Sequence, residues 1–176
     1  MTKILLTGRP GIGKTTIIRA VVSELTGVKA NGFYTQEIKE GTRKGFKLIT
    51  LDGREEVLAH RDLSTPFRVG KYSVSLAGLE RVGVPAIMDG LKGDLVVIDE
   101  IGRMELYSEK FRDAVMEALK SPTPLLGTIM AKPDQFVDRI KEEERVEVVE
   151  VTYSNRDKLA KRIADTLFSL PPEGLR

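Results

Sequence analysis

A glycine-rich segment near the amino terminus constrains the fold of this chain more than any other feature. It has Gly, four further residues, then Gly-Lys-Thr, and its residues are Gly8, Arg9, Pro10, Gly11, Ile12, Gly13, Lys14 and Thr15. A short apolar run from Lys3 to Thr7 precedes it, and apolar residues at helical spacing follow it from Lys14 to about Thr26. The segment therefore links a buried strand to the start of a helix, which is typical of an α/β fold.

Each residue type in this segment suits the binding of phosphate groups. Glycines at 8, 11 and 13 allow successive backbone N–H groups to curl around an anion, and the helix that follows adds a favourable dipole. Lys14 can then reach the β- and γ-phosphates of a nucleotide, while the Thr15 hydroxyl ligates Mg²⁺. The alternative is a glycine turn that only connects strand to helix. The position between strand and helix favours a P-loop that binds nucleoside triphosphates with Mg²⁺.

A second acidic element supports this interpretation. The run from Leu95 to Asp99 is the clearest buried strand of the chain, and Glu100 follows it directly. A carboxylate at the end of a strand beside a P-loop can hold the Mg²⁺ hydration shell, and the next Glu can accept a proton from an attacking water. We therefore assign Asp99, with Thr15, to the metal and Glu100 to catalysis. The alternative for Glu100 is a solvated turn carboxylate.

Several further side chains have two interpretations. Arg103 could neutralise transition-state charge as a catalytic residue, or it could pair on the surface with Glu105 or Glu109. Thr128 could sense the γ-phosphate, but packing is the favoured role, and the only histidine, His60, suits a surface position better than catalysis. Packing is also favoured over base stacking for three aromatic residues, Phe33, Tyr34 and Tyr72.

The middle of the chain changes its pattern. Between about Gly32 and Arg61, short alternating runs separated by turn residues predict an antiparallel meander. The stretch from Ser75 to Lys92 is helical but is interrupted at Gly83-Val84-Pro85, which predicts two short helices or one kinked helix. Further on, Ser108 is a candidate N-cap for a helix.

Strands and helices alternate again towards the carboxyl end. We expect strands at 124–130 and 146–151, a helix at about 134–143, and a last helix that Asn155 caps. The pattern predicts a three-layer α/β P-loop NTPase fold, with a mainly parallel sheet flanked by helices and an antiparallel strand-rich insert at 32–62 after the first helix. We expect one domain over 1–176 with a short tail at 171–176.

Composition excludes several classes of function. The 28 Lys and Arg exceed the 26 Asp and Glu by only two, so the chain lacks the positive field of a dedicated nucleic-acid binder. Zero cysteines exclude disulfides and thiolate chemistry, and one histidine excludes a histidine-pair metal site. We find no membrane segment or signal-peptide pattern, and we expect a cytoplasmic monomer. The scarcity of Asn, Gln and Cys, with abundant Lys, Glu and Arg, is typical of a thermophile.

A switch GTPase is an alternative that the motifs disfavour. Asp99–Gly102 matches Asp-x-x-Gly, and Ala131–Asp134 nearly matches the Asn/Thr-Lys-x-Asp segment that recognises guanine. However, Ala131 lacks the polar side chain of that motif, and only one helix and one strand separate the two segments. GTP therefore remains a candidate substrate, while the switch mechanism is rejected.

Together with the P-loop, three segments carry a resemblance to a known family: 32–37 (GFYTQE), 69–72 (VGKY) and 99–106 (DEIGRMEL). On these residues the chain resembles the small thermophile-type nucleoside-triphosphatase family, the family of the cancer-related nucleoside-triphosphatase. The resemblance implies Mg²⁺-dependent hydrolysis of ATP, GTP and other nucleoside triphosphates to diphosphates. Because no segment offers a convincing guanine or adenine reader, we expect low base selectivity, with ATP, GTP, CTP and UTP all hydrolysed to diphosphate and phosphate. The residues that we place at the nucleotide are Gly8, Arg9, Pro10, Gly11, Ile12, Gly13, Lys14, Thr15, Thr16, Asp99, Glu100, Ile101, Gly102, Arg103, Met104, Glu105 and Leu106.

Three classes of function remain, and a hydrolase is favoured. A nucleotide or small-metabolite kinase that uses the same P-loop is the alternative, but the strand-rich insert does not resemble a helical acceptor-binding domain. A nucleotide-dependent binding module is disfavoured by the small net charge and by Glu100, which a module that only binds nucleotide does not need.

Overall fold

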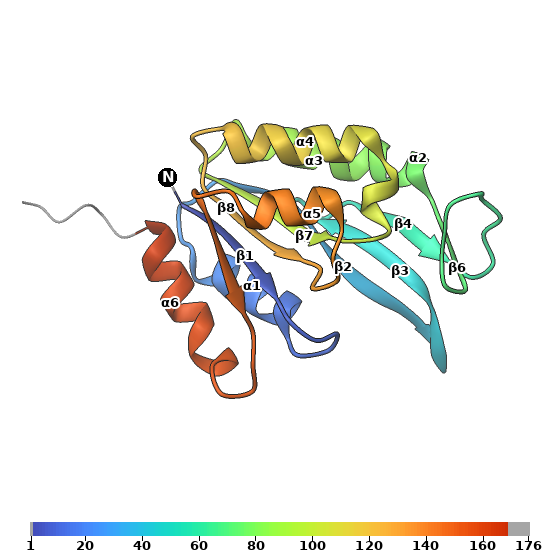
Figure 1. The fold of residues 1–176 in the computed structure, drawn as a ribbon, viewed down its shortest axis with the longest axis horizontal. Helices are drawn as coiled ribbons and strands as arrows, with labels where there is room; N and C mark the ends of the chain where they lie inside the picture. The colour runs from blue at the N-terminus through green and yellow to red at the C-terminus, as the bar shows by residue number, and fades with distance from the viewer. Residues whose placement is uncertain (1, 169–176) are drawn as a thin grey trace, which may run out of the picture.

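The strands form one continuous sheet in a computed structural model that describes residues 2–168 (Figure 1). The order across this nine-stranded sheet is β5-β6-β4-β3-β2-β7-β8-β1-β9. The strands are β1 (Lys3–Thr7), β2 (Ala30–Glu40), β3 (Thr42–Thr50), β4 (Glu55–His60), β5 (Arg68–Val69), β6 (Tyr72–Val74), β7 (Leu95–Ile101), β8 (Leu125–Ile129) and β9 (Val146–Glu150). The expected short tail at 171–176 lies outside the described residues.

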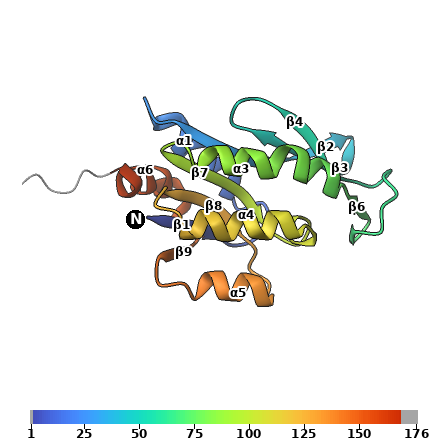
Figure 2. The ribbon, with the colours of Figure 1, turned by 90° about the horizontal axis from the view of Figure 1, so that it is seen from above.

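Helices cover both faces of the parallel part of the sheet, as the sequence predicts. They are α1 (Lys14–Glu24), α2 (Leu76–Gly78), α3 (Val84–Gly90), α4 (Glu109–Lys120), α5 (Gln135–Lys141) and α6 (Arg156–Phe168). Side chains of α3, α4 and α5 pack into one hydrophobic cluster on one face, and those of α1 and α6 pack into a second cluster on the other (Figures 1 and 2). The three-layer α/β architecture is therefore confirmed.

Strand β2 joins the parallel and antiparallel parts of the sheet. Its first residues, Ala30–Phe33, pair in parallel with β7, and the rest of the strand pairs antiparallel with β3. Gly32 permits this close pairing because its φ is +125° and a Cβ there would lie 1.9 Å from the Val97 carbonyl oxygen. Antiparallel pairing therefore begins at Phe33, next to the predicted start of the insert at 32–62, and β5 and β6 extend the insert beyond its predicted end.

The stretch from Leu76 to Gly90 is one continuous helix. A π turn, Leu79–Gly83, connects α2 to α3, and the Val84 N–H donates to the Leu79 carbonyl across it. Pro85 is the second residue of α3, directly after this π turn, and the helix continues through it. The interruption that the sequence predicts is thus a widened turn inside one helix.

Some strands end at other residues than the sequence predicts, because pairing with a neighbouring strand decides where they end. Strand β7 continues past Asp99 to Ile101 because Ile101 still pairs with Ile129 of β8. The predicted cap at Ser108 is confirmed, since its hydroxyl accepts a hydrogen bond from the Phe111 N–H. Among residues 2–168, no helix combines the length and the hydropathy that a membrane span needs.

Candidate active site

The P-loop connects the end of β1 to the first residue of α1. Gly11 and Gly13 have φ values of +78° and +111°, a conformation that L side chains rarely adopt, and this lets the loop curl before the helix begins. The Lys14 ammonium donates to the carbonyl oxygens of Gly8 at 2.9 Å and Arg9 at 3.0 Å. The loop thus presents its lysine next to the backbone amides at the start of α1.

Two hydroxyl groups hold the Asp99 carboxylate from opposite sides. Thr15 donates to Asp99 Oδ2 at 2.6 Å, and Thr128 of β8 donates to Asp99 Oδ1 at 2.6 Å. Asp99 and Thr128 are both buried. Burial raises the pKa of Asp99, and the hydrogen bonds from Thr128 and Thr15 oppose that rise. Thr128 therefore packs, as the sequence favours, but its hydroxyl also fixes the orientation of Asp99.

Glu100 turns its side chain towards the P-loop side of the sheet. A Cβ at residue 102 would lie 2.7 Å from Glu100 Oε1, so Gly102 leaves the space that this carboxylate occupies. Burial and the nearby Asp99 raise the pKa of Glu100, and Lys14 lowers it. A carboxylate in this environment is a stronger base than one in water, so the solvated-turn alternative does not fit.

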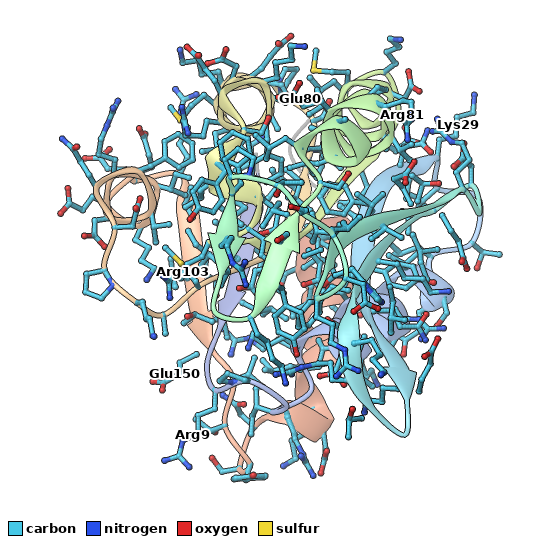
Figure 3. The ribbon with its side chains drawn as sticks, turned by 90° about the vertical axis from the view of Figure 1, so that its right-hand side faces the viewer. Arg9, Lys29, Glu80, Arg81, Arg103 and Glu150 are labelled. Atoms are coloured by element: carbon cyan, nitrogen blue, oxygen red, sulfur yellow. The ribbon has the colours of Figure 1, made fainter. Side chains whose placement is uncertain are left out.

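A cleft of about 870 Å³ lies between the P-loop, the loop after β7 and the antiparallel strands. Most of the residues that the sequence assigns to the nucleotide line it: Gly8, Arg9, Pro10, Gly11, Gly13, Lys14, Thr15, Thr16, Glu100, Arg103, Met104 and Glu105. In Figure 3, Arg9 of the P-loop, Glu150 at the end of β9 and Arg103 of the loop after β7 lie along one side of the view.

Five assigned residues do not line the cleft: Ile12, Asp99, Ile101, Gly102 and Leu106. Ile12 and Ile101 are buried in the two core clusters, and Leu106 packs against one of them. Asp99 lies beneath the cleft on its two hydroxyl partners. The side chains of Ile12, Ile101 and Leu106 thus stabilise the loops that carry their neighbours.

Two groups of lining residues were not assigned from the sequence. The ends of β8 and β9 contribute Met130, Ala131, Lys132 and Glu150. Because the carboxyl ends of parallel strands meet at one edge of a sheet, this first group had a usable signal. The antiparallel strands and the hairpin after them contribute Thr35, Gln36, Glu37, Arg43, Phe46, Leu58 and Val69. The fold of β2 to β5 beside the cleft brings this second group to the site.

Contacts in the fold decide between the interpretations that the sequence left open for three further side chains. Arg103 is exposed at the cleft, and within residues 2–168 no carboxylate lies within ion-pair distance of it, so the surface pairs with Glu105 and Glu109 do not form. His60 accepts a hydrogen bond from the Asp62 N–H and does not line the cleft. Phe33 is fully buried and packs against Phe111 in the core.

This combination of fold and site defines a class of protein. A P-loop after β1 that faces a buried aspartate and a cleft glutamate on β7, with β8 between the two strands, is the arrangement of P-loop nucleotide hydrolases. The NTPase family matches residues 3–164, and the chain belongs to that family.

Individual relatives agree over nearly the whole chain. The chain is 49% identical to a protein named nucleoside-triphosphatase THEP1 from Thermotoga petrophila, over 92% of this chain and 90% of that protein. It is 39% identical to the protein of the same name from Methanocaldococcus jannaschii, over 95% of this chain and 98% of that protein.

Two solved structures have the same fold. The crystal structure of THEP1 from Aquifex aeolicus matches with a TM-score of 0.86 and 32% identity, over 94% of this chain and 99% of that one. The solution structure of a human cancer-related nucleoside triphosphatase matches with a TM-score of 0.83 and 36% identity, over 97% of this chain and 100% of that one. These comparisons agree with the resemblance found in the motifs, and they give no support to a kinase.

Proposed function

We propose that this chain hydrolyses nucleoside triphosphates to the diphosphate and inorganic phosphate. The observation that carries the proposal is Glu100, a carboxylate that lines the same cleft as Lys14 and has a pKa raised by burial and by Asp99. Relatives named nucleoside-triphosphatase, at up to 49% identity, support the same activity. A site that only bound nucleotide would not need a base at this position.

The P-loop would bind the phosphates, with its backbone N–H groups and the Lys14 ammonium facing the charged oxygens. Thr15 and Asp99 suit a magnesium ion because they offer hydroxyl and carboxylate oxygens only 2.6 Å apart, which are the hard ligands that Mg²⁺ prefers. When bound, Mg²⁺ supplies positive charge to the β- and γ-phosphate oxygens.

Glu100 would then accept a proton from the water that attacks the terminal phosphorus. Oxygen from this water forms the new bond to phosphorus, and the bond to the oxygen of the leaving diphosphate breaks. Arg103 lines the cleft without a carboxylate partner among residues 2–168, so its charge is available to the phosphoryl oxygens in the transition state.

Base selectivity should be low. Of the residues at the ends of β8 and β9, Ala131 stands where a guanine-reading motif would place a polar side chain. Recognition would therefore rest on the phosphates and Mg²⁺, and ATP, GTP, CTP and UTP should all be hydrolysed. A preference beyond about 10³-fold for one base would contradict this expectation, because selectivity of that size requires a polar reader.

The decisive experiment is phosphate release from each triphosphate by the wild-type protein and by Glu100→Gln. The glutamine keeps the shape but removes the base, so kcat should fall by about 10²- to 10⁴-fold while nucleotide affinity changes little. Glu109→Gln, on the exposed first turn of α4, is the matched control and should behave like wild type.

Diphosphate formation, measured beside phosphate release with and without candidate acceptors, distinguishes a hydrolase from a kinase. A kinase would consume nucleotide slowly with water and much faster once an acceptor is added. If Glu100→Gln keeps the wild-type rate of phosphate release, the proposed role of Glu100 is wrong.

A further inference from the structure

The cleft contains a second glutamate whose environment differs from that of a surface acid. Glu105 lies in the short 3₁₀ turn Glu105–Tyr107, which follows the Arg103 loop. Its side chain lines the cleft, yet the residue is only 4% exposed. Within residues 2–168, no Lys, Arg or His lies within ion-pair distance of its carboxyl group. Proteins rarely bury a carboxyl group without a cation beside it.

Several cations among residues 2–168 line this cleft, but none of them forms an ion pair with Glu105. The cations that line it are Arg9, Lys14, Arg43, Arg103 and Lys132. Arg43, the cation of strand β3, already pairs with Glu37 at 2.9 Å and donates to Tyr72 Oη at 3.0 Å.

The acidic groups act in the opposite direction. Glu37, Glu100 and Glu150 line the cleft with Glu105, and Asp99 lies beneath it. Burial is the largest cause that holds the pKa of Glu105 well above its usual range, and the nearby Glu100 and Asp99 act in the same direction. Hydrogen bonds from the backbone of Glu105 and Gly102 oppose this rise but do not cancel it. Burial and a neighbouring acid both favour the neutral form of a carboxyl group, and the more buried group is affected most. Glu105 is more buried than Glu100.

A protonated carboxyl group differs from a carboxylate in one essential property, because its O–H is a hydrogen-bond donor. An ionised acid at this position would repel a triphosphate, whereas a neutral acid can bind one of its oxygens. We propose that Glu105 works as a neutral carboxylic acid that donates a hydrogen bond to the terminal phosphoryl group of the bound triphosphate. This proposal rests on the proposed function, since it requires a nucleotide in the cleft.

Glu100 and Glu105 therefore have opposite tasks although they are chemically identical. Glu100 accepts a proton from water, and Glu105 donates a hydrogen bond to phosphate. The same substitution should separate them, since glutamine cannot replace a base but its amide N–H can replace a neutral O–H donor.

The test compares Glu105→Leu with Glu105→Gln in steady-state phosphate release. Leucine is apolar and of similar size, so it should preserve the fold but lower kcat/KM by about 10-fold, the effect of one lost hydrogen bond. Glutamine should restore most of that loss, in contrast to Glu100→Gln. Glu109→Gln again serves as the control. A Glu105→Gln variant as slow as Glu105→Leu, or a Glu105→Leu variant as fast as wild type, would refute the proposal.

A spectroscopic measurement tests the protonation state without turnover. The infrared difference between the nucleotide-free wild-type protein and Glu105→Gln at pH 7 should contain the C=O stretch of a protonated carboxylic acid, and the difference for Glu109→Gln should lack it. A carboxylate band in its place would overturn the proposal even if both variants are slow. Absence of phosphate release by the wild-type protein would refute the proposed function instead, and the infrared band would still report on Glu105.

Discussion

Replacement of Thr128 by valine tests how the site holds Asp99. Valine has the shape of threonine and fits the fully buried position, so the change removes one hydroxyl and little else. The lost hydrogen bond spans 2.6 Å to a carboxylate that is itself 1% exposed, so water cannot replace it. A hydrogen bond to a charged group contributes about 1.5–3 kcal/mol. We therefore expect kcat/KM for triphosphate hydrolysis to fall by about 10- to 100-fold in Thr128→Val.

The pH dependence gives a second readout of the same variant. Because the Thr128 hydroxyl lowers the pKa of Asp99, its removal raises that pKa. Asp99 must be ionised to hold a metal, so the loss of activity on acidification should begin at a higher pH in Thr128→Val than in wild type.

The assay is kcat/KM for phosphate release at a series of Mg²⁺ concentrations and pH values, with circular dichroism to confirm the fold. Thr166→Val, on the exposed surface of α6, is the matched control and should change nothing by more than about 0.5 kcal/mol. An activity of Thr128→Val within about threefold of wild type, with an unchanged acid limb, would show that the hydroxyl only packs.

Two further predictions concern Lys14, the first residue of α1, and Lys3, the first residue of β1. Lys14→Ala should abolish phosphate release and weaken triphosphate binding in calorimetry while the fold persists. The reason is that the motif places this cation on the β- and γ-phosphates, so unchanged affinity and turnover would contradict the prediction. Lys3 is buried and its ammonium donates to the carbonyl oxygens of Ala118 at 2.7 Å and Ser121 at 2.9 Å, at the end of α4. Lys3→Met should lower the free energy of unfolding in urea by about 3 kcal/mol, and the exposed Lys158→Met should lower it by less than about 0.5 kcal/mol. Equal effects would mean that the Lys3 hydrogen bonds add no stability.

The local parts of this molecule were predictable because the sequence encodes them within a few neighbouring residues. The P-loop is one such part, since Gly11 and Gly13 require their positive φ and Lys14 begins the helix. The buried strand before Asp99 and the cap at Ser108 are others. In each case the residues that determine the structure are adjacent in the chain, so their pattern is legible without tertiary contacts.

The helix interruption was only half predictable. The sequence indicates a break at Gly83-Val84-Pro85. However, a proline by itself shows only that one backbone N–H is missing and that its ring crowds the carbonyl group of the preceding turn. Whether the chain separates into two helices or widens one turn depends on what it packs against. Here Gly83 lies close to Leu79 and Phe33, and packing against the sheet holds the helix together through a π turn.

The sequence alone therefore determined the class of site and the phosphate-binding loop, while the tertiary structure decided which side chains surround them. Arg43 carries no local signal because it reaches the site from β3. The hydroxyl of Thr128 meets Asp99, and Glu105 becomes buried, only in the assembled fold. Lys3 belongs to a strand in the sequence but stabilises the end of a distant helix in the fold. Burial and charge at a position depend on every element that packs there, and these elements meet only when the sheet assembles.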